Sequence, residues 1–368
     1  MARAEDVGMS AERLARVKAA MQRYVDRGEV PGVVTLIARR GRVVHFESIG
    51  YRDVESRVPM TPDTIFRLAS MTKPIVAAAL MTLYEEGEFQ LSDPVSRLLP
   101  EYQSMQVVQP QGADGNYSLA PLRNPVTIRH VLTHTSGVQS GRGLLGTQYS
   151  KVAPRTVPND TLANFVTRLA ALPVNFEPGT KWEYGASGNG IAGSGRLVEV
   201  ISKKPLDRFI EERIFRPLRM NDTYFYLPEE KLARFAVLYK PGPDNRIEVD
   251  EKPDRNSLYF RERTFLSGTG GLVSTVSDYL RFQQMMLNGG ELDGVRILGR
   301  KTVELISSNH IGNLPVASRG PGHGFGLAVS VVTDVGASGQ LGSVGTYGWS
   351  GATARSRSSI LPRSSSAS

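Results

Sequence analysis

Ser70 and Lys73 lie three residues apart, immediately before the apolar run 74–83. If this run forms a helix, Ser70 stands at its N-terminus and Lys73 lies one turn further along the same face. The free N–H groups and the positive dipole end of a helix N-terminus stabilise an oxyanion. A desolvated lysine beside a second basic group can lose its proton and take the proton of a serine hydroxyl. The spacing therefore indicates a serine nucleophile with a lysine base.

The same four-residue pattern has a simpler explanation, an ordinary N-cap serine followed by a solvated lysine. The chain contains no other S-x-x-K among its 368 residues. It also contains no G-x-S-x-G, which excludes the nucleophile elbow of an α/β-hydrolase. The neighbouring segments must therefore decide between the two readings.

The segments before Ser70 predict a helix followed by a hairpin. Ser10 can cap a helix that ends at Gly28. The β-branched runs 33–38 and 43–48 are joined at Arg40-Gly41, as in an antiparallel hairpin. This order indicates an α+β fold, with an antiparallel β-sheet flanked by helices, rather than a doubly wound one.

The middle of the chain is predicted to be mostly helical. Residues 105–124 and 138–160 read as loops because of their glycine and proline content, and residues 325–333 read as one strand. Helices are expected over residues 127–134, 160–172 (capped by Asp160), 189–203, 205–215 and 277–287. We therefore expect a discontinuous sheet domain over 1–89 and 241–354, a helical domain over 90–240 and a disordered tail over 355–368.

The second of these loops carries apolar residues that could contact substrate. Leu144, Leu145 and Tyr149 could line an apolar acyl pocket, and packing of the loop on its own domain is the equal alternative.

Composition limits the function further. There is no cysteine, so thiol nucleophiles and thiolate metal sites are excluded. His130 and His134 have helical i,i+4 spacing, but no carboxylate stands beside them, so no metal and no cofactor are expected. The net charge of +8 is spread diffusely, which argues against nucleic-acid binding. Neither a signal peptide nor a membrane span is visible, and a cytoplasmic location is expected by default.

Several separated motifs together resemble the class C β-lactamase-like superfamily. They are the segments 70–73 (SMTK), 130–137 (HVLTHTSG), 178–184 (PGTKWEY), 217–223 (PLRMNDT) and 270–275 (GGLVST). They stand in the family's order, and the resemblance covers roughly residues 10 to 351. Within the superfamily the chain looks most like a family VIII carboxylesterase, because its third motif is Trp349-Ser350-Gly351.

The resemblance implies roles for particular residues. Ser70 would be the nucleophile and Lys73 its base. Tyr184 matches the tyrosine of the Y-x-N motif and would act with Lys73 as general base and then acid. The alternative for Tyr184 is a buried core tyrosine with a satisfied hydroxyl. The oxyanion hole would consist of the backbone N–H groups of Ser70 and Ala352.

Three features depart from the family pattern. Ala186 replaces the asparagine of Y-x-N, and Ser187 and Asn189 are the candidates to substitute for it. Trp349 replaces the lysine or histidine that begins the third motif, which favours packing on apolar groups over pairing with a carboxylate. Only 17 residues follow Gly351, and 355–368 is nearly all arginine and serine, so the C-terminal end is expected to be truncated and the chain less stable than its relatives.

These observations predict a serine esterase acting on small-molecule esters through an acyl-enzyme on Ser70. Trp349, Ser350, Gly351 and Tyr149 are expected to bind substrate. A β-lactamase or D-alanyl peptidase, an acyltransferase and an inactive binding protein remain as alternatives. Oligomeric state does not follow from the sequence.

Overall fold

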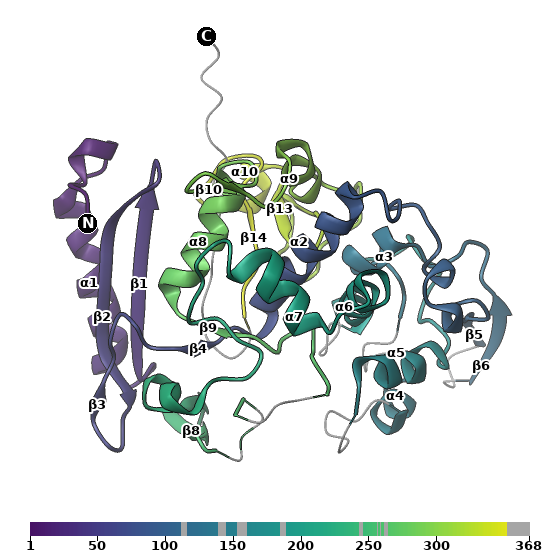
Figure 1. Ribbon diagram of the computed structural model, residues 1–368, viewed down its shortest axis with the longest axis horizontal. Coiled ribbons are helices and arrows are strands. Elements are labelled where there is room, and N and C mark those ends of the chain that lie inside the picture. Colours follow the sequence, from purple (N-terminus) through teal and green to yellow (C-terminus); the bar gives the residue numbers. More distant parts are fainter. Residues whose placement is uncertain are drawn as a thin grey trace, which may run out of the picture. The chain divides into compact units, whose positions relative to one another are not determined.

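The computed structural model divides into two compact units (Figure 1). Unit 1 comprises Met1–Leu68, Arg219–Glu262 and Leu272–Gln284. Unit 2 comprises Ala69–Leu218, Arg263–Gly271 and Met285–Ser368. The structure describes residues 1–111, 116–138, 145–152, 160–184, 189–242, 246–255, 257, 259–260 and 264–351.

Unit 1 begins with a helix and a hairpin, as predicted. Helix α1 (Ala11–Asp26) starts at Ser10, whose hydroxyl accepts a hydrogen bond from the Arg13 N–H. Strands β1 (Gly32–Arg39) and β2 (Arg42–Asp53) pair antiparallel, and β3 (Val58–Pro59) joins them to form a sheet in the order β1-β2-β3. Arg40 and Gly41 both have positive φ, which a two-residue hairpin turn with the right twist requires.

The rest of unit 1 consists of two short strand pairs and a set of ion pairs. Strand β4 (Phe66–Arg67) pairs with β9 (Val273–Ser274), and β7 (Leu238–Pro241) pairs with β8 (Ile247–Glu251). Helix α8 (Val276–Leu287) starts in this unit. Asp222 binds the Arg234 guanidinium through both carboxylate oxygens and also accepts from Lys231. These contacts connect the start of the segment 219–262 to the short 3-10 helix Glu229–Arg234.

Unit 2 is built around α2 (Thr72–Glu85), which is drawn in blue in Figure 1. Nearly all of its side chains are buried, as expected for a helix that is apolar on every face. It contacts α6 (Asn189–Ser202) and α7 (Leu206–Ile210), and α7 continues into a π-helical turn, Glu211–Phe215. The other helices are α3 (Ile128–Leu132), α4 (Gly146–Val152), α5 (Leu162–Ala170), α9 (Arg300–Ile306) and α10 (Val335–Ser338).

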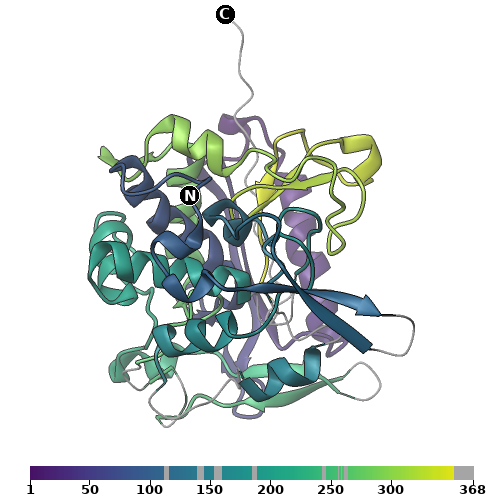
Figure 2. The ribbon, with the colours of Figure 1, turned by 90° about the vertical axis from the view of Figure 1, so that its right-hand side faces the viewer.

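Two local predictions in this unit were wrong. Residues 105–124 were expected to form a loop, but β5 (Gln106–Gln111) and β6 (Asn116–Pro121) form the antiparallel hairpin drawn in blue in Figure 2. Asp160 does not cap the following helix. Thr161 caps it, while Asp160 binds the Arg168 guanidinium with both carboxylate oxygens.

The strand expected over 325–333 is two strands. Strands β12 (His323–Phe325) and β13 (Ser330–Val332) are joined by a tight turn, in which Ala328 has a positive φ. In this turn the Ala328 N–H donates a hydrogen bond to the Leu132 carbonyl at the end of α3. Strand β14 (Tyr347–Gly348) completes a sheet in the order β12-β13-β14. Trp349 therefore follows an edge strand, and a second hairpin, β10 (Glu291–Leu292) with β11 (Val295–Arg296), precedes α9.

The predicted α+β class, with antiparallel strands and flanking helices, is confirmed by these elements. The two compact units do not follow the boundaries 1–89, 90–240 and 241–354, and that division into sheet and helical domains stays a prediction. The tail 355–368 lies outside the described residues. Within the described part of the chain, no helix is both long and apolar enough to cross a bilayer.

Candidate active site

Ser70 lies at the start of α2, as the sequence predicted. A single 3-10 turn, Ala69–Met71, leads into the helix at Thr72. Ala69 has φ 45°, a left-handed conformation that costs energy for a residue with a side chain. Gly270 is a neighbour of this backbone, since a Cβ built on Gly270 would lie at ordinary van der Waals distance, 3.5 Å, from the Ala69 carbonyl carbon. The chain thus turns sharply just before the serine.

Two polar side chains of unit 2, those of Lys73 and Tyr184, meet at the Ser70 hydroxyl. The Ser70 Oγ lies 2.6 Å from the Tyr184 Oη. The Lys73 Nζ donates to the Ser70 Oγ at 2.9 Å and to the Thr269 carbonyl oxygen at 2.7 Å. Because the lysine donates to Oγ, the single hydrogen of the serine hydroxyl is available to Tyr184. This geometry allows the proton of Ser70 to pass to the phenolic oxygen.

Lys73 is only 2% exposed, so its ammonium has lost nearly all contact with water. Burial lowers the pKa of Lys73 because it disfavours the charged form, and the phenol of Tyr184 opposes this shift only in part. A lysine with a lowered pKa can exchange a proton with a hydroxyl nearer to neutral pH.

The pKa of the Tyr184 phenol is also lowered, but by different causes. Burial by itself would raise the pKa of Tyr184, but the nearby charge of Lys73 and the hydrogen bonds from Ser70 and Lys73 outweigh burial, so the pKa lies below its usual value. The Lys73 Nζ lies 5.3 Å from the centre of the phenol ring. The two residues therefore favour the protonation states that proton transfer from serine requires.

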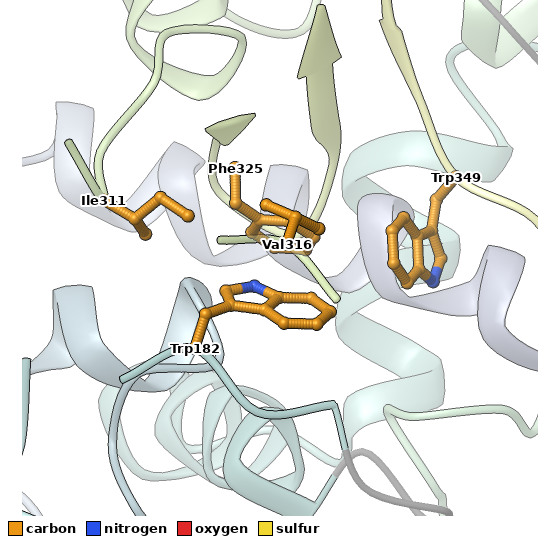
Figure 3. Close-up of a cluster of buried hydrophobic side chains, with 5 residues drawn as sticks. All are labelled: Trp182, Ile311, Val316, Phe325 and Trp349. Carbon is orange, nitrogen blue, oxygen red and sulfur yellow. The ribbon is translucent and has the colours of Figure 1, made fainter. Parts of the chain in front are cut away.

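An aromatic cluster holds Tyr184 in place. Its buried members are Trp182, Ile311, Val316, Phe325 and Trp349 (Figure 3), and Tyr184 packs against them. The Tyr184 ring stacks on that of Trp182, with centroids 6.1 Å apart, and lies 5.2 Å from that of Trp349. Aromatic rings in such contact restrict one another's rotation, which fixes the position of the phenolic oxygen.

His134 belongs to the same surroundings but not to a metal site. Its ring is 4% exposed and meets the rings of Tyr184 and Phe325 edge to face, with centroids 4.8 Å and 5.3 Å away. Its Nε2 has no hydrogen-bond partner within the described residues. Burial and the charge of Lys73 both lower its pKa well below the usual value, so the ring is neutral at pH 7. Among the residues that the structure describes, no three histidine or acidic side chains gather as a metal would require.

Of the predicted substrate-binding residues, the structure places Trp349 beside Tyr184 and Tyr149 in a separate helix. Trp349 is buried against Tyr184, and Ser350 and Gly351, both half-buried, follow it. Tyr149 is buried in α4, a helix that contacts α5, and its place in a substrate pocket stays a prediction. Ala352, Ala186, Ser187 and Leu144 lie outside the described residues, and so does the side chain of Asn189.

The sequence did not indicate three features around Ser70 and Trp349: the Thr269 carbonyl, the place of His134 and the place of Arg319. The Thr269 carbonyl binds Lys73, but a backbone acceptor has no signature in the sequence beyond the glycines around it. The i,i+4 spacing of His130 and His134 points only to a metal ligand and not to packing against Tyr184. Nothing in the sequence indicates the contact of the Arg319 guanidinium, which lies 4.8 Å from the centre of the Trp349 ring.

A beta-lactamase family model matches residues 17–363 of this chain. The chain belongs to the beta-lactamase family. An uncharacterized protein of Mycobacterium tuberculosis is 35% identical, over 91% of this chain and 84% of that protein. Esterase EstB of Burkholderia gladioli is 31% identical, over 92% of this chain and 84% of that enzyme.

Among solved structures, the chain is similar to EstCE1, described as a hydrolase with promiscuous acyltransferase activity, with a TM-score of 0.78 and 27% identity. The similarity covers 92% of this chain and 88% of that one. These findings confirm the resemblance to family VIII esterase-like serine hydrolases that the sequence motifs indicated.

Proposed function

We propose that this chain is a serine carboxylesterase that hydrolyses small esters through an acyl-enzyme on Ser70. The observation that carries the proposal is the contact of the Ser70 Oγ with both the Lys73 Nζ and the Tyr184 Oη, at 2.9 Å and 2.6 Å. An alcohol between two groups of shifted pKa is the arrangement that nucleophilic catalysis uses. The similarity to an esterase supports the same activity.

In the proposed reaction, Tyr184 is a phenolate whose own proton is held by the Lys73 amine, and it accepts the proton of Ser70 while Oγ attacks the ester carbonyl carbon. The tetrahedral oxyanion is stabilised by the Ser70 N–H and by the N–H proposed at Ala352. Tyr184 then returns the proton to the leaving alcohol, and the C–O bond to that alcohol breaks. Water attacks the acyl carbonyl by the same route in reverse, which releases the acid and restores the Ser70 hydroxyl. Lys73 shares the general base and acid role with Tyr184 in both transfers, because its amine takes the phenol proton that would otherwise block the phenolic oxygen.

The third motif and Tyr149 are proposed to contact the substrate. Trp349 presents an indole next to Tyr184, with Ser350 and Gly351 following it. Small uncharged esters fit an aromatic wall of this kind.

The test is pre-steady-state hydrolysis of p-nitrophenyl acetate, followed by intact-mass spectrometry of the quenched protein. We expect a burst of p-nitrophenol and an acetyl adduct on the peptide that contains Ser70. Replacing Ser70 with alanine should remove the adduct and lower turnover by about a thousandfold or more. Turnover that survives in Ser70→Ala would contradict the assignment.

An acyltransferase is the second candidate, because EstCE1 is described as having that activity besides hydrolysis. Here an alcohol in place of water would take the acyl group from Ser70. Adding a primary alcohol to the same assay should then yield a new ester at the expense of the free acid.

The remaining alternatives have separate tests. Nitrocefin hydrolysis as fast as ester hydrolysis would favour a β-lactamase or D-alanyl peptidase. Failure of Ser70 to react with a fluorophosphonate probe would favour an inactive binding protein. The cytoplasmic location also stays a prediction.

A further inference from the structure

We infer that Ser267 is a positioning residue, which holds the Thr269 carbonyl against the Lys73 amine. The inference rests on the proposed function and adds a residue to the same site. The Lys73 Nζ donates to the Ser70 Oγ and to the Thr269 carbonyl oxygen, and Tyr184 accepts from it as well. Of these three acceptors, the carbonyl takes no part in the proposed reaction. It can therefore keep the amine in place before and after each proton transfer.

The Thr269 carbonyl belongs to a peptide unit whose orientation Ser267 fixes. Because this peptide bond is planar and trans, the Thr269 C=O and the Gly270 N–H point in opposite directions. The Gly270 N–H donates to the Ser267 carbonyl at 3.3 Å, and the Gly271 N–H donates to the same oxygen at 3.0 Å. With its N–H directed to Ser267, the peptide unit directs its oxygen to Lys73, which it meets at 2.7 Å.

The hydroxyl of Ser267 also binds Thr269. Its Oγ accepts from the Thr269 N–H at 3.4 Å and lies 2.9 Å from the Thr269 Oγ1. Serine hydroxyls commonly fix turns by bonding to the backbone two residues further on. Thr269 is therefore held through its own N–H and its side chain, as well as through the peptide unit that follows it.

The turn itself lies against two helices of unit 2. Gly268 is buried, and a Cβ built on it would lie 3.3 Å from the Val76 Cγ1 in α2 and 3.5 Å from the Gly195 Cα in α6. There is little room for a side chain, so the backbone of the turn packs directly on the helices. Because Val76 lies one turn after Lys73 in α2, the amine and the turn that binds it are attached to the same helix.

The part of the turn that can still move is the peptide unit after Thr269. Gly270 has no side chain to resist its rotation, so hydrogen bonds must hold it. When the Ser267 hydroxyl is removed, the unit can rotate and the Lys73 amine loses an acceptor. A carbonyl on an amine favours its charged form, whereas burial disfavours that form in Lys73. Loss of the acceptor therefore makes the amine easier to deprotonate.

The experiment measures the titration of the Lys73 amine by NMR, in protein prepared with ¹³C-labelled lysine. The signal of the lysine Cε moves when the amine loses its proton, and Lys73→Met identifies the signal of this residue. Ser267→Ala should lower the midpoint by about 0.5 to 1 pH unit, as partial loss of a hydrogen bond to a charged group does. Tyr184 and His134 are the other titratable groups that face Lys73, and the variant leaves both in place.

The burst of p-nitrophenol from p-nitrophenyl acetate gives a second readout. In Ser267→Ala its rate constant should fall roughly threefold to thirtyfold, because proton transfer from Ser70 depends on Lys73. The substrate concentration that gives half of the maximal burst rate should change less than about twofold, since substrate binding is not affected. Ser267→Thr keeps a hydroxyl and should lie closer to wild type than Ser267→Ala in both measurements.

Two other variants complete the test. Ser202→Ala is the matched control, because the Ser202 Oγ accepts the N–H of Lys204, which is also two residues further on. It should leave the midpoint and the burst rate unchanged. Thr269→Val removes the other hydroxyl of the pair and keeps the carbonyl, so it should lower the midpoint as well. This variant tests the same turn if Ser267→Ala does not fold.

An unchanged midpoint in Ser267→Ala, or an equal shift in Ser202→Ala, would overturn the role of Ser267. A slower burst with an unchanged midpoint would overturn it too, because the effect would then not pass through Lys73. The titration requires no turnover, so it tests Ser267 even if the wild-type protein forms no acyl adduct on Ser70. Absence of that adduct would contradict only the proposed function.

Discussion

The imidazole of His134 lies edge-on against the phenol of Tyr184, with the ring centroids 4.8 Å apart and the planes at 68°. The backbone connects the same two segments, because the Glu183 N–H donates to the His134 carbonyl. We therefore propose that His134 positions Tyr184 by packing against its ring and does not contact the reacting atoms.

His134 should make the protein sensitive to acid. Its folded-state pKa lies well below the usual value, so below about pH 6.5 the unfolded chain binds a proton that the folded chain does not. Stability from this group is complete above pH 6.5 and is lost as the pH falls. Relative to wild type, His134→Phe should gain about 1.4 kcal/mol per pH unit below 6.5, down to the folded-state pKa. Urea unfolding between pH 7 and pH 5 measures this difference.

The control for this experiment is His323→Phe, which removes a histidine outside the aromatic cluster. If both variants follow the wild-type pH dependence, His134 does not titrate as described.

Lys73→Met should make the protein more stable and inactive. The substitution removes an amine whose charged form is disfavoured by burial, and it keeps a side chain of similar length. We expect the free energy of unfolding at pH 7 to rise by about 1–3 kcal/mol. The advantage should shrink toward pH 10.5, since the lysine is then neutral in the unfolded chain as well. Lys204→Met, at an exposed ion pair, should change stability little.

Tyr184→Phe separates proton transfer from packing. The phenylalanine ring can keep the contacts with Trp182, His134 and Trp349 but has no oxygen for the Ser70 proton. We expect kcat/KM for p-nitrophenyl acetate to fall by about 10² to 10⁴, with the melting temperature nearly unchanged. Activity within a factor of three of wild type would remove Tyr184 from the proposed reaction.

Asp222→Asn tests the ion pairs of unit 1. Asp222 accepts from Arg234 at 2.9 and 2.8 Å and from Lys231 at 2.6 Å, with its side chain 23% exposed. Unfolding free energy should fall by about 1–3 kcal/mol, less than for a fully buried pair because water screens part of it. Asp63 also pairs with Arg234 but is 60% exposed, so Asp63→Asn should cost much less. Equal losses would show that burial does not set the strength of these pairs.

The sequence was most informative where local chemistry determines structure. Ser10 as a helix cap and Arg40-Gly41 as a hairpin turn depend only on neighbouring residues, and both were predicted correctly. The sequence-based predictions were wrong where a residue far away in the chain determines the local structure. Gln106–Gln111 becomes a strand by pairing with β6, and Asp160 binds Arg168 instead of capping a helix.

The same distinction holds for the candidate site. The spacing of Ser70 and Lys73 indicated that they meet, and the motif around Tyr184 added the third group. No spacing connects Arg319 with Trp349 or Thr269 with Lys73, because the fold alone brings these residues together.

The near-complete enclosure of Lys73 has a consequence for the choice between hydrolysis and transfer. Because its amine faces Ser70, Thr269 and Tyr184 and not the solvent, bulk water cannot relay protons to it directly. In the proposed reaction, a second nucleophile therefore gives its proton to the Tyr184 oxygen and not to Lys73 directly. Under the proposed mechanism, an acid is released when water takes the acyl group and a new ester when another alcohol does, and the buried amine of Lys73 serves both outcomes alike.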